Sequence, residues 1–486
     1  MDRVEEDALA NEKVLLMRDF PEQLAFYHEI QRIRGEGGYR FLDAPGGTGK
    51  TFLLNAIVED ARANGDVAIS VASSGISALL LDRGSTMHSR FKAPVHDFEP
   101  GVPEPNMANP FGEHSAHYEL LRRVSLIVWD EAPMMHRWLL DYLDFLLREV
   151  RQNTRPFGGV TIILGGDFRQ VLPVIRHGNA GAVIDACMKR SNRWHLFNTV
   201  HLTENVRVKK QQGNPAYAEW LLRLGNGNVP VVEGTDDVIE LPPKMCEPCD
   251  VDAAVDFAFP HLALHYHDAS WIRDRAILAP HNATVQTLND ECLRRIPGEI
   301  VCLESANNAK FESEDDVLPP EFLSTLEAGN LPPHHLRVKN GAALILLRNI
   351  NPAEGLCNGT RLILDETLPG NRVLRCRIAS DDPKFNGKTV LIPRIKFVQK
   401  ETDWGYAWVR RQFPVRLAYA ITINKAQGQT LHRVAVWLEQ PCFAHGQLYV
   451  ASARCGDDKN VRFFVNPVLD DHPTSTYNVV YKEVLS

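Results

Sequence analysis

A glycine-rich stretch between a strand pattern and a helix pattern limits the folds open to this chain more than any other feature. Residues 43–51 read Asp-Ala-Pro-Gly-Gly-Thr-Gly-Lys-Thr, after a strand-like run at 39–43 and before apolar helical positions at 52–58. Such a turn wraps backbone N–H groups around phosphates, and the helix N-terminus adds its positive dipole end. The context matches a Walker A loop, so the sequence predicts an α/β fold that binds a nucleotide. The residues expected to hold the phosphates are Gly46, Gly47, Thr48, Gly49 and Lys50.

Two residues at the end of this loop carry specific expectations. Lys50 would reach the β- and γ-phosphates of ATP, and the Thr51 hydroxyl would ligate Mg²⁺. One position departs from the G-x-x-x-x-G-K-[ST] pattern, because Ala44 stands where the pattern has Gly. Alanine is costly there if the position needs a positive φ. The alternative is a chance Gly-rich turn, and the strand–turn–helix context favours the nucleotide loop.

Composition places the chain among ordinary globular proteins. Its 486 residues, 44% of them hydrophobic, predict two to four domains. No apolar run approaches the roughly 18 residues of a membrane span, and the acidic first residues do not resemble a targeting sequence. Nine scattered cysteines indicate a reducing compartment, so we expect a nuclear or otherwise intracellular location. A net charge of −8 argues against a uniformly basic nucleic-acid coat but leaves a local basic channel open.

One cysteine pattern approaches the spacing of a zinc finger. Cys246 and Cys249 are followed by His261 and His265. The linker between the two pairs is short for a finger, and its alternating Asp, Ala, Val and Phe are typical of an ordinary amphipathic segment. We therefore expect a structural segment here rather than a zinc site.

The order of strand and helix patterns predicts two lobes and an insertion. Short apolar strands alternate with helices in the first part of the chain, which is typical of a parallel sheet covered on both faces. Residues 92–118 interrupt this alternation with five prolines and little periodicity, so we expect a surface excursion. The expected boundaries are 1–198 for the first lobe, 199–300 and 413–486 for the second, and 301–412 for a small inserted β-barrel.

Two carboxylates follow an apolar strand pattern at 124–129. At the carboxyl end of a parallel strand beside the phosphate loop, Asp130 would hold Mg²⁺ through water and Glu131 would polarise the attacking water. A further strand pattern ends in the turn 166–170, where Gln170 would sense the γ-phosphate or orient that water. Each pattern alone is also typical of a surface turn. Their order after the phosphate loop favours a catalytic role.

Two arginines in the later part of the chain are candidates for the γ-phosphate. Arg207 and Arg454 would stabilise the charge of phosphoryl transfer as arginine fingers do, when two lobes close around one ATP. Either could instead form a surface ion pair. The loop 425–430 follows a helix pattern and is rich in hydrogen-bond donors, which suits coupling of the ATP state to a bound strand. Around this loop we expect Gly428 to bind the nucleotide and Thr422 and Lys425 to bind nucleic acid.

Polar and aromatic residues in two further segments of the first lobe could grip a sugar–phosphate backbone and stack a base. A solvated loop is the competing interpretation for each of them. The candidates are Ser73, Ser74, His88, Ser89, Phe91 and Lys92.

Taken in order, these motifs resemble the petite-integration-frequency (PIF) family of superfamily 1 DNA helicases, most closely the branch found with Helitron transposons. The segment Phe20-Pro-Glu-Gln23 is similar to the family's Q motif, which implies that Gln23 reads adenine. The resemblance covers about residues 15–466, and the tract 333–342 is particularly similar to the Helitron-associated branch. The other similar segments are 44–51, 71–76, 84–91, 130–133, 166–170, 202–207, 413–430 and 449–454.

The resemblance implies two RecA-like lobes, with the excursion acting as a wedge and an SH3-like barrel inserted in the second lobe. It also implies an ATP- and Mg²⁺-dependent motor that moves 5′ to 3′ on single-stranded DNA and acts at junctions with duplex. Such a motor would be a monomer when free and able to dimerise on DNA. Departures from the family pattern are Ala44, Val206 and Ser452-Ala453, none of which removes a charged catalytic group.

Two other functions stay open at this level. A chain that keeps the fold but hydrolyses ATP poorly would be a nucleic-acid-binding module, and Ala44 with the altered 449–454 segment would suit it. An RNA-acting enzyme of superfamily 1 would carry the same motifs. A small-molecule kinase has no use for the motifs of the second lobe.

Overall fold

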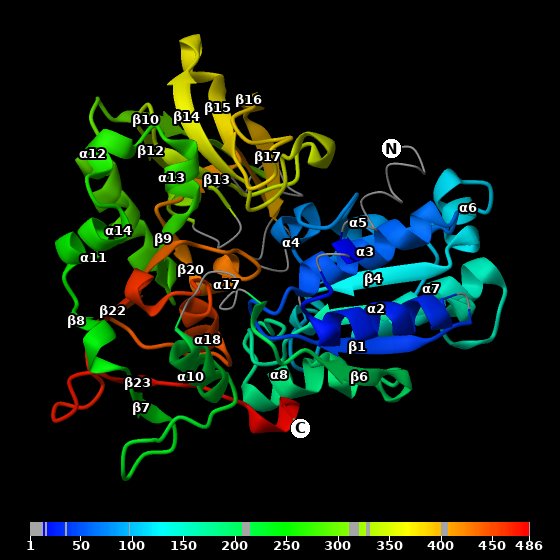
Figure 1. The fold of residues 1–486 in the computed structure, drawn as a ribbon. Helices are drawn as coiled ribbons and strands as arrows, with labels where there is room; N and C mark the ends of the chain where they lie inside the picture. The colour runs from blue at the N-terminus through cyan, green and yellow to red at the C-terminus, as the bar shows by residue number, and fades with distance from the viewer. Residues whose placement is uncertain are drawn as a thin grey trace.

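Two α/β lobes lie side by side, and a β-rich insertion stands on the second lobe (Figure 1). The loop between β1 and α3, which holds the glycine-rich stretch, faces the second lobe: Gly49 lies against Val206 and Gly46 against Ala453. The computed structural model describes residues 13–14, 17–34, 36–96, 98–206, 214–310, 320–326, 331–399 and 407–485.

The first lobe is a parallel sheet with both faces buried. Alternate residues of one strand show this, because Leu126 and Val128 pack with the helices of one face while Ile127 and Trp129 pack with α7 on the other. The strand order is β3-β2-β4-β5-β1-β6. The bounds are β1 Tyr39–Asp43, β2 Ala68–Ala72, β3 Ser85–Thr86, β4 Leu126–Asp130, β5 Thr161–Gly166 and β6 Asn198–His201.

Strand order brings the candidate catalytic segments of this lobe together. β5 lies between β1 and β4, with Asp43 paired to Gly166 and Trp129 paired to Leu164. Parallel strands present their carboxyl ends at one edge of a sheet, so the loops after β1, β4 and β5 meet there.

Helices cover the sheet where the sequence has apolar residues at helical spacing. α7 buries Leu139, Leu143, Leu146 and Val150 along one side. α4 begins where Ser74 Oγ accepts a hydrogen bond from the Ser77 N–H. The bounds are α2 Pro21–Ile33, α3 Lys50–Ala63, α4 Gly75–Leu79, α5 Met87–Phe91, α6 Ala116–Arg123, α7 Trp138–Arg151 and α8 Ala180–Ala186.

The predicted excursion lies against α7. Its described residues between α5 and α6, 92–96 and 98–115, form no helix or strand. Trp138 Nε1 donates to Pro105 O at 3.1 Å, Arg137 pairs with Glu104 at 2.6 Å, and the Phe98 ring stacks on His136. These contacts attach the excursion to the lobe at several points along its length.

The second lobe is a smaller parallel sheet in the order β20-β9-β21-β22-β8. Its strands are β8 Cys246–Pro248, β9 Arg275–Ala279, β20 Ala420–Thr422, β21 Arg433–Leu438 and β22 Val461–Val465, and β7 Val238–Glu240 pairs with β23 Ser475–Tyr477 beside it. Its helices are α10 Pro215–Gly225, α11 Val251–Ala258, α12 Leu262–His265, α13 Ala269–Arg273, α14 Asn282–Arg295, α17 Ile423–Ala426 and α18 Gln447–Ser452.

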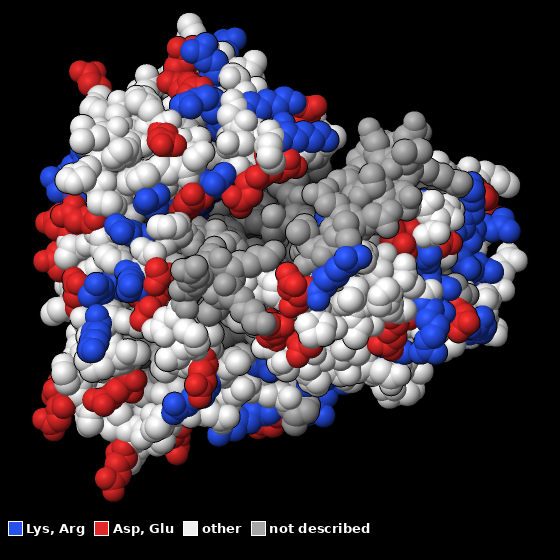
Figure 2. Space-filling view, viewed as in Figure 1, with Lys and Arg blue, Asp and Glu red and all other residues white. Residues whose placement is uncertain are grey.

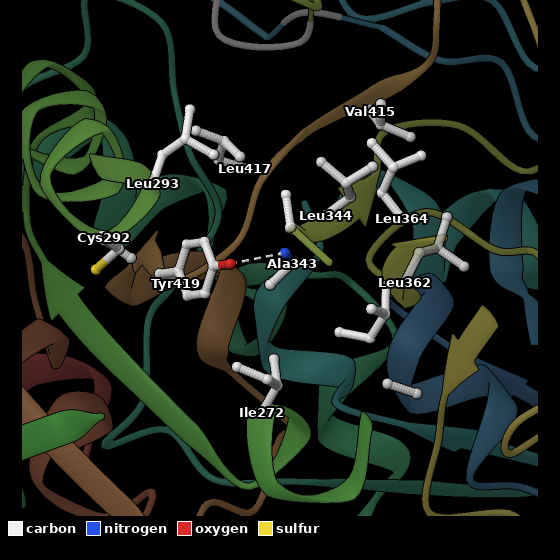
Figure 3. Close-up of a cluster of buried hydrophobic side chains, with 14 of the residues drawn as sticks. Ile272, Cys292, Leu293, Ala343, Leu344, Leu362, Leu364, Val415, Leu417 and Tyr419 are labelled. Atoms are coloured by element: carbon white, nitrogen blue, oxygen red, sulfur yellow. Dashed lines mark hydrogen bonds between the residues drawn. The ribbon is translucent and has the colours of Figure 1, made fainter. Parts of the chain in front are cut away.

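The insertion shares its core with the second lobe. Tyr419, at the start of the return into the lobe, accepts a hydrogen bond from the Ala343 N–H at 3.1 Å, amid Leu344, Leu362 and Leu417 (Figure 3). Among the described strands, antiparallel pairing gives separate sheets with no pairing that closes one ring, so the SH3-like barrel stays a prediction. The sheets are β10-β12, β11-β18-β17 and β16-β15-β14-β13-β19. The bounds are β10 Val301–Glu304, β11 Ala306–Lys310, β12 His335–Val338, β13 Ala343–Leu346, β14 Arg361–Thr367, β15 Val373–Ala379, β16 Thr389–Pro393, β17 Ile395–Gln399, β18 Ala407–Gln412 and β19 Val415–Leu417, and helix α15 is Pro320–Thr325.

Two segments lie on the other side of the predicted lobe boundaries. β6 pairs with β1 in the first sheet, so the first lobe extends to His201 rather than ending at residue 198. Near the C-terminus, Val484 is 2% exposed and packs in the core of the first lobe, together with Tyr481 and Leu485. These residues follow β23 of the second lobe, so the chain crosses between the lobes a second time.

Candidate active site

The turn between β1 and α3 has the backbone of a phosphate-binding loop. Gly47 and Gly49 have φ values of 92° and 80°, in the left-handed region that glycine enters without strain. Ala44 has no positive φ, and its N–H donates to Gly166 O at 2.9 Å. The alanine therefore fits its position, and the departure from the motif introduces no backbone strain.

Lys50 reaches both carboxylates that follow β4. Its Nζ donates to Asp130 Oδ1 and to Glu131 Oε1, the latter at 3.2 Å. Thr51 Oγ1 donates to Asp130 Oδ2 at 3.3 Å. The three charged residues are buried, with 9% of Lys50, 2% of Asp130 and 7% of Glu131 exposed. Buried charges need close partners, and these residues supply them to one another.

The protonation states follow from this cluster. Burial lowers the pKa of Lys50, but the charges of Asp130 and Glu131 outweigh burial and leave that pKa raised. Burial raises the pKa of Glu131, but Lys50 and then Arg454 outweigh burial and leave it lowered. Burial raises the pKa of Asp130, and Lys50 offsets only part of that shift. At neutral pH Glu131 is a carboxylate and Lys50 an ammonium.

The donor set fits a Mg²⁺-bound nucleotide. The Lys50 ammonium lies against both Asp130 and Glu131, where negative charge favours a cation. Thr51 and Asp130 already contact each other, and they offer the oxygen ligands that Mg²⁺ prefers.

Glu131 has an unusual backbone conformation. Its φ is 54° and ψ 33°, the left-handed region in which a residue with a side chain is strained by about 1–3 kcal/mol. Two contacts within the first lobe hold it: Glu131 N–H donates to Asp130 Oδ1 at 2.8 Å, and Ser73 Oγ–H donates to Glu131 O at 2.6 Å. Strain of this kind accumulates at functional sites, where the surroundings over-determine the conformation.

The second lobe contributes two residues to Glu131. Gln427 Nε2 donates to Glu131 Oε2 at 3.3 Å, and Gln427 is 3% exposed. The charge of Arg454 lowers the pKa of Glu131, while Arg454 Nη1 donates to Gln429 O at 3.1 Å. Gly428 lies beside α4, where an added Cβ would be 2.5 Å from Ser77 Oγ, and its expected contact with the nucleotide stays a prediction. The side chain that reaches the site is that of its neighbour Gln427.

Gln23, the residue expected to bind adenine, is hydrogen-bonded to the phosphate loop. Gln23 Nε2 donates to Thr48 O at 3.0 Å, while its Oε1 is buried without a hydrogen-bond partner among the described residues. Asn205 Nδ2 donates to Gly46 O at 3.3 Å, so the segment after β6 also contacts the loop. Arg207 is two residues further along the chain, and it lies outside the residues that the structure describes.

The turn after β5 connects the two lobes. Arg169 pairs with Asp167 at 2.8 Å and with Asp43 at 3.2 Å, and its Nε donates to Asn226 Oδ1 of the second lobe at 2.8 Å. Tyr449 OH donates to Asp167 Oδ2 at 2.9 Å from the same side. Gln170 is 3% exposed, and no described residue donates a hydrogen bond to its Oε1.

The first-lobe candidates for nucleic acid divide into exposed and buried residues. Ser89 and Lys92 are exposed, and His88 is half-buried. Phe91 is 0% exposed in the core, so the expectation that it stacks a base is wrong for this conformation: α5 packs that face onto β2 and α7. Ser74 caps α4, and Ser73 is 8% exposed with its hydroxyl bonded to Trp129 Nε1 and Glu131 O. Ser73 therefore supports Glu131 rather than presenting a free hydroxyl to a strand.

The second-lobe candidates lie at the end of β20. Thr422 and Lys425 are half-buried around α17. Burial, with a smaller contribution from Arg416, lowers the pKa of Lys425 to about 8. Lys425 makes no ion pair with any residue the structure describes, and its contact with nucleic acid stays a prediction.

Comparison with known proteins agrees with this geometry. Residues 20–235 match the family model of the PIF1-like helicase, and residues 321–366 match that of the 2B domain of the DNA helicase Pif1. Together the two matches span more than half of the chain. The chain belongs to the PIF1-like helicase family.

Relatives of this PIF1-like chain agree over most of its length. It is 28% identical over 436 residues to the human ATP-dependent DNA helicase PIF1 and 26% identical over 439 residues to that of Danio rerio, matches that take in 89% and 87% of the chain. The chain spans 58% of the length of each. A solved structure of Pif1 helicases, described as two coordinating helicases at forked double-stranded DNA, is 25% identical, has a TM-score of 0.65 and covers 92% of both chains. The two lobes are accordingly RecA-like, while the Helitron-associated branch stays a prediction.

The structure also bears on the zinc-finger pattern, on membrane helices and on the distribution of surface charge. Among the described residues no group of three or more His, Cys, Asp or Glu is arranged to hold a metal. Burial raises the pKa of both Cys246 and Cys249 to about 12, which favours thiols over zinc-binding thiolates. None of the described helices has the length and apolarity to cross a membrane. Acidic and basic residues are interspersed on the face in Figure 2, without a surface of one sign.

Several residues of the site were not anticipated from the sequence. Gln427, Arg169 and Tyr449 belong to recognised motifs, but their roles depend on which residue of a turn faces the other lobe. The contact of Asn205 with the phosphate loop could not be predicted for the same reason. The usable signal was the density of polar side chains after strands β5 and β6, which indicates a site without identifying its members.

Proposed function

We propose that this PIF1-like chain is an ATP-dependent DNA helicase that moves 5′ to 3′ on single-stranded DNA and separates duplex ahead of it. The observation that carries this proposal is the position of Glu131. Its carboxylate contacts Lys50 of the phosphate loop on one side and Gln427 of the opposite lobe on the other. A hydrolytic residue held between two lobes responds to their relative position, as a motor requires.

The residues of the site divide the chemistry among them. Lys50 leaves the carboxylates for the β- and γ-phosphates, and Glu131, freed from this partner, orients and polarises water. Arg454 stabilises charge from the second lobe, and Gln23 recognises adenine. Thr51 and Asp130 would hold Mg²⁺, which would neutralise part of the phosphate charge. We assign a second stabilising arginine to Arg207 on the strength of the family pattern alone.

The strand partner belongs to the same proposal. Lys425 and Thr422 of the second lobe, with Ser89, Lys92 and His88 of the first, would line the path of single-stranded DNA. The excursion 92–118 would split the duplex at a junction. The solved Pif1 structure at forked DNA involves two coordinating helicases, so we propose a monomer that pairs on DNA, in a nuclear or other intracellular setting.

The test is an ATPase assay with no nucleic acid, with single-stranded DNA and with single-stranded RNA, for the wild type and Lys50→Ala. We expect strong stimulation by DNA that is absent in the variant. Duplexes with a 5′ or a 3′ tail then give the polarity, and replacing residues 99–104 with a Gly-Ser linker tests the wedge. Stimulation by RNA alone would favour an RNA-acting enzyme. A low rate that ignores both would favour a binding module.

A further inference from the structure

Glu131 is held from two sides, and the two contacts differ in kind. Ser73 Oγ donates to the main-chain oxygen of Glu131 at 2.6 Å, within one lobe and between adjacent strands. Gln427 Nε2 donates to the side-chain oxygen at 3.3 Å, across the junction between lobes. The first contact is short and independent of lobe position. The second is long for a hydrogen bond, so a small displacement strengthens or breaks it.

Several contacts hold the turn that carries Gln427. It directly follows α17, and its N–H donates to Asn424 O. Two residues before it, the Lys425 carbonyl accepts a hydrogen bond from Gln429 Nε2 at 3.0 Å. One residue after it, Gly428 has a φ of 80° and leaves no space for a Cβ against Ser77 Oγ. A displacement of Lys425 is therefore passed to the Gln427 side chain.

The Gln427 amide is also incompletely bonded. Its Oε1 is buried and has no hydrogen-bond partner among the described residues. A buried polar atom that makes no hydrogen bond is destabilising, because it has lost its bonds to water without replacing them. The side chain is thus not in its most favourable environment in this conformation, and a rearrangement that gives Oε1 a partner is favoured.

We propose that Gln427 is a positioning residue that couples strand binding at Lys425 to the orientation of the Glu131 carboxylate. The inference rests on the proposed function and adds the residue through which DNA would control hydrolysis. Ser73 fixes the backbone of Glu131 whether or not DNA is bound. Gln427 orients the Glu131 side chain when single-stranded DNA is bound at the second lobe.

Coupling of this kind is measured as a ratio of affinities. The dissociation constant of a fluorescent ATP analogue is determined with and without a saturating thymidine oligonucleotide, and the ratio is the coupling factor, which for allosteric sites is typically about 5 to 150. By reciprocity the nucleotide changes DNA affinity by the same factor, which gives an internal check. Stimulation of ATPase by the same oligonucleotide is recorded alongside.

The decisive variant is Gln427→Met, which keeps length and shape but removes the donor. Gln427→Glu is the second, because it places a like charge against Glu131. We expect the coupling factor to fall to about 1 in both, a loss of about fivefold or more. The matched control is Gln286→Met, at an exposed glutamine of α14 whose amide donates only to Asp290 Oδ2, at 3.3 Å, among the described bonds. Its coupling factor should stay at the wild-type value.

The outcomes separate the inference from the function on which it rests. If DNA neither changes the affinity of the wild type for the ATP analogue nor stimulates its ATPase, the proposed function is contradicted. A stimulated wild type with the same coupling factor in Gln427→Met overturns the inference and leaves the function standing. Loss of nucleotide binding in both variants, with wild-type thermal stability, also overturns it, since Gln427 would then belong to the binding site itself.

Discussion

The phosphate-loop region and the region around Lys425 differ in how their buried cations are paired. Around the phosphate loop, Lys50 contacts two carboxylates and Arg169 pairs with Asp43 and Asp167. At the end of β20, Lys425 is partly buried without an ion-pair partner among the described residues, and its pKa is lowered. The cations of the first region are already paired with carboxylates, whereas the cation of the second has no such partner among the described residues.

The difference predicts how each region responds to change. An internally paired cluster couples function to stability, because removing one member leaves its partners buried and unsatisfied. An unpaired cation can be altered with little cost to the fold, but its loss weakens the ligand complex. The variants below test that contrast.

The largest effect is expected for Lys50→Ala. It removes the cation from two buried carboxylates, so we expect about 3–5 kcal/mol less stability to unfolding as well as loss of ATPase. Because the carboxylates raise the pKa of Lys50, its contribution is complete at neutral pH and is lost only as pH rises through that raised pKa. Urea unfolding at pH 7 measures it. Lys92→Ala, at an exposed lysine, should change stability by about 0.5 kcal/mol or less, and an equal loss in both would remove the contrast.

Phe91→Ala tests whether the α5 segment belongs to the paired interior or to the strand path. The ring is 0% exposed, so truncation should cost about 3–5 kcal/mol of stability. DNA affinity of the folded fraction should not change. Phe443, 58% exposed, is the matched aromatic, and Phe443→Ala should leave stability nearly unchanged. A stable Phe91→Ala protein with weakened DNA binding would restore the stacking role predicted from the sequence.

Phe91 also shows what the sequence could and could not determine. Motif order predicted the two α/β lobes, the phosphate loop and the carboxylates after β4, because strand–turn–helix patterns are local in the sequence. It did not determine which side of α5 faces inward. The five-residue helix is too short to show a periodicity, and its burial is decided by contacts with α7, far away in the chain.

Register within a turn set the other limit. The sequence placed a function in the loop after α17 and named Gly428 there, but it did not identify Gln427, whose side chain donates to Glu131. Which side chain of a turn points into a site depends on backbone dihedrals, which residue types alone do not determine. β6 was assigned to the wrong lobe because a strand at the end of a sheet looks the same whichever sheet it joins.

Ser73→Ala gives an intermediate effect on the nucleotide side. It leaves Trp129 Nε1 and the Glu131 carbonyl buried without their hydroxyl partner, at about 1–3 kcal/mol. We expect a lower kcat, because the left-handed backbone of Glu131 loses a restraint. The ratio of rates with and without DNA should not change, which distinguishes this contact from that of Gln427. Ser270→Ala, at an exposed serine of α13, is the control, and a change of DNA affinity in Ser73→Ala alone would return Ser73 to the strand path.

The smallest effect is a pH dependence of DNA binding at Lys425. Because burial lowers its pKa to about 8, this lysine is mostly charged at pH 7 and mostly neutral at pH 9 in the free protein. A phosphate binds the charged form, so DNA affinity should fall as pH rises above 8, by at most about tenfold per pH unit. Lys425→Arg keeps its charge over this range, so its affinity should stay level. Fluorescence anisotropy with a labelled thymidine oligonucleotide at fixed ionic strength measures both curves. Parallel curves would mean that Lys425 does not contact the strand, and the unpaired charge at the end of β20 would then need a different anion.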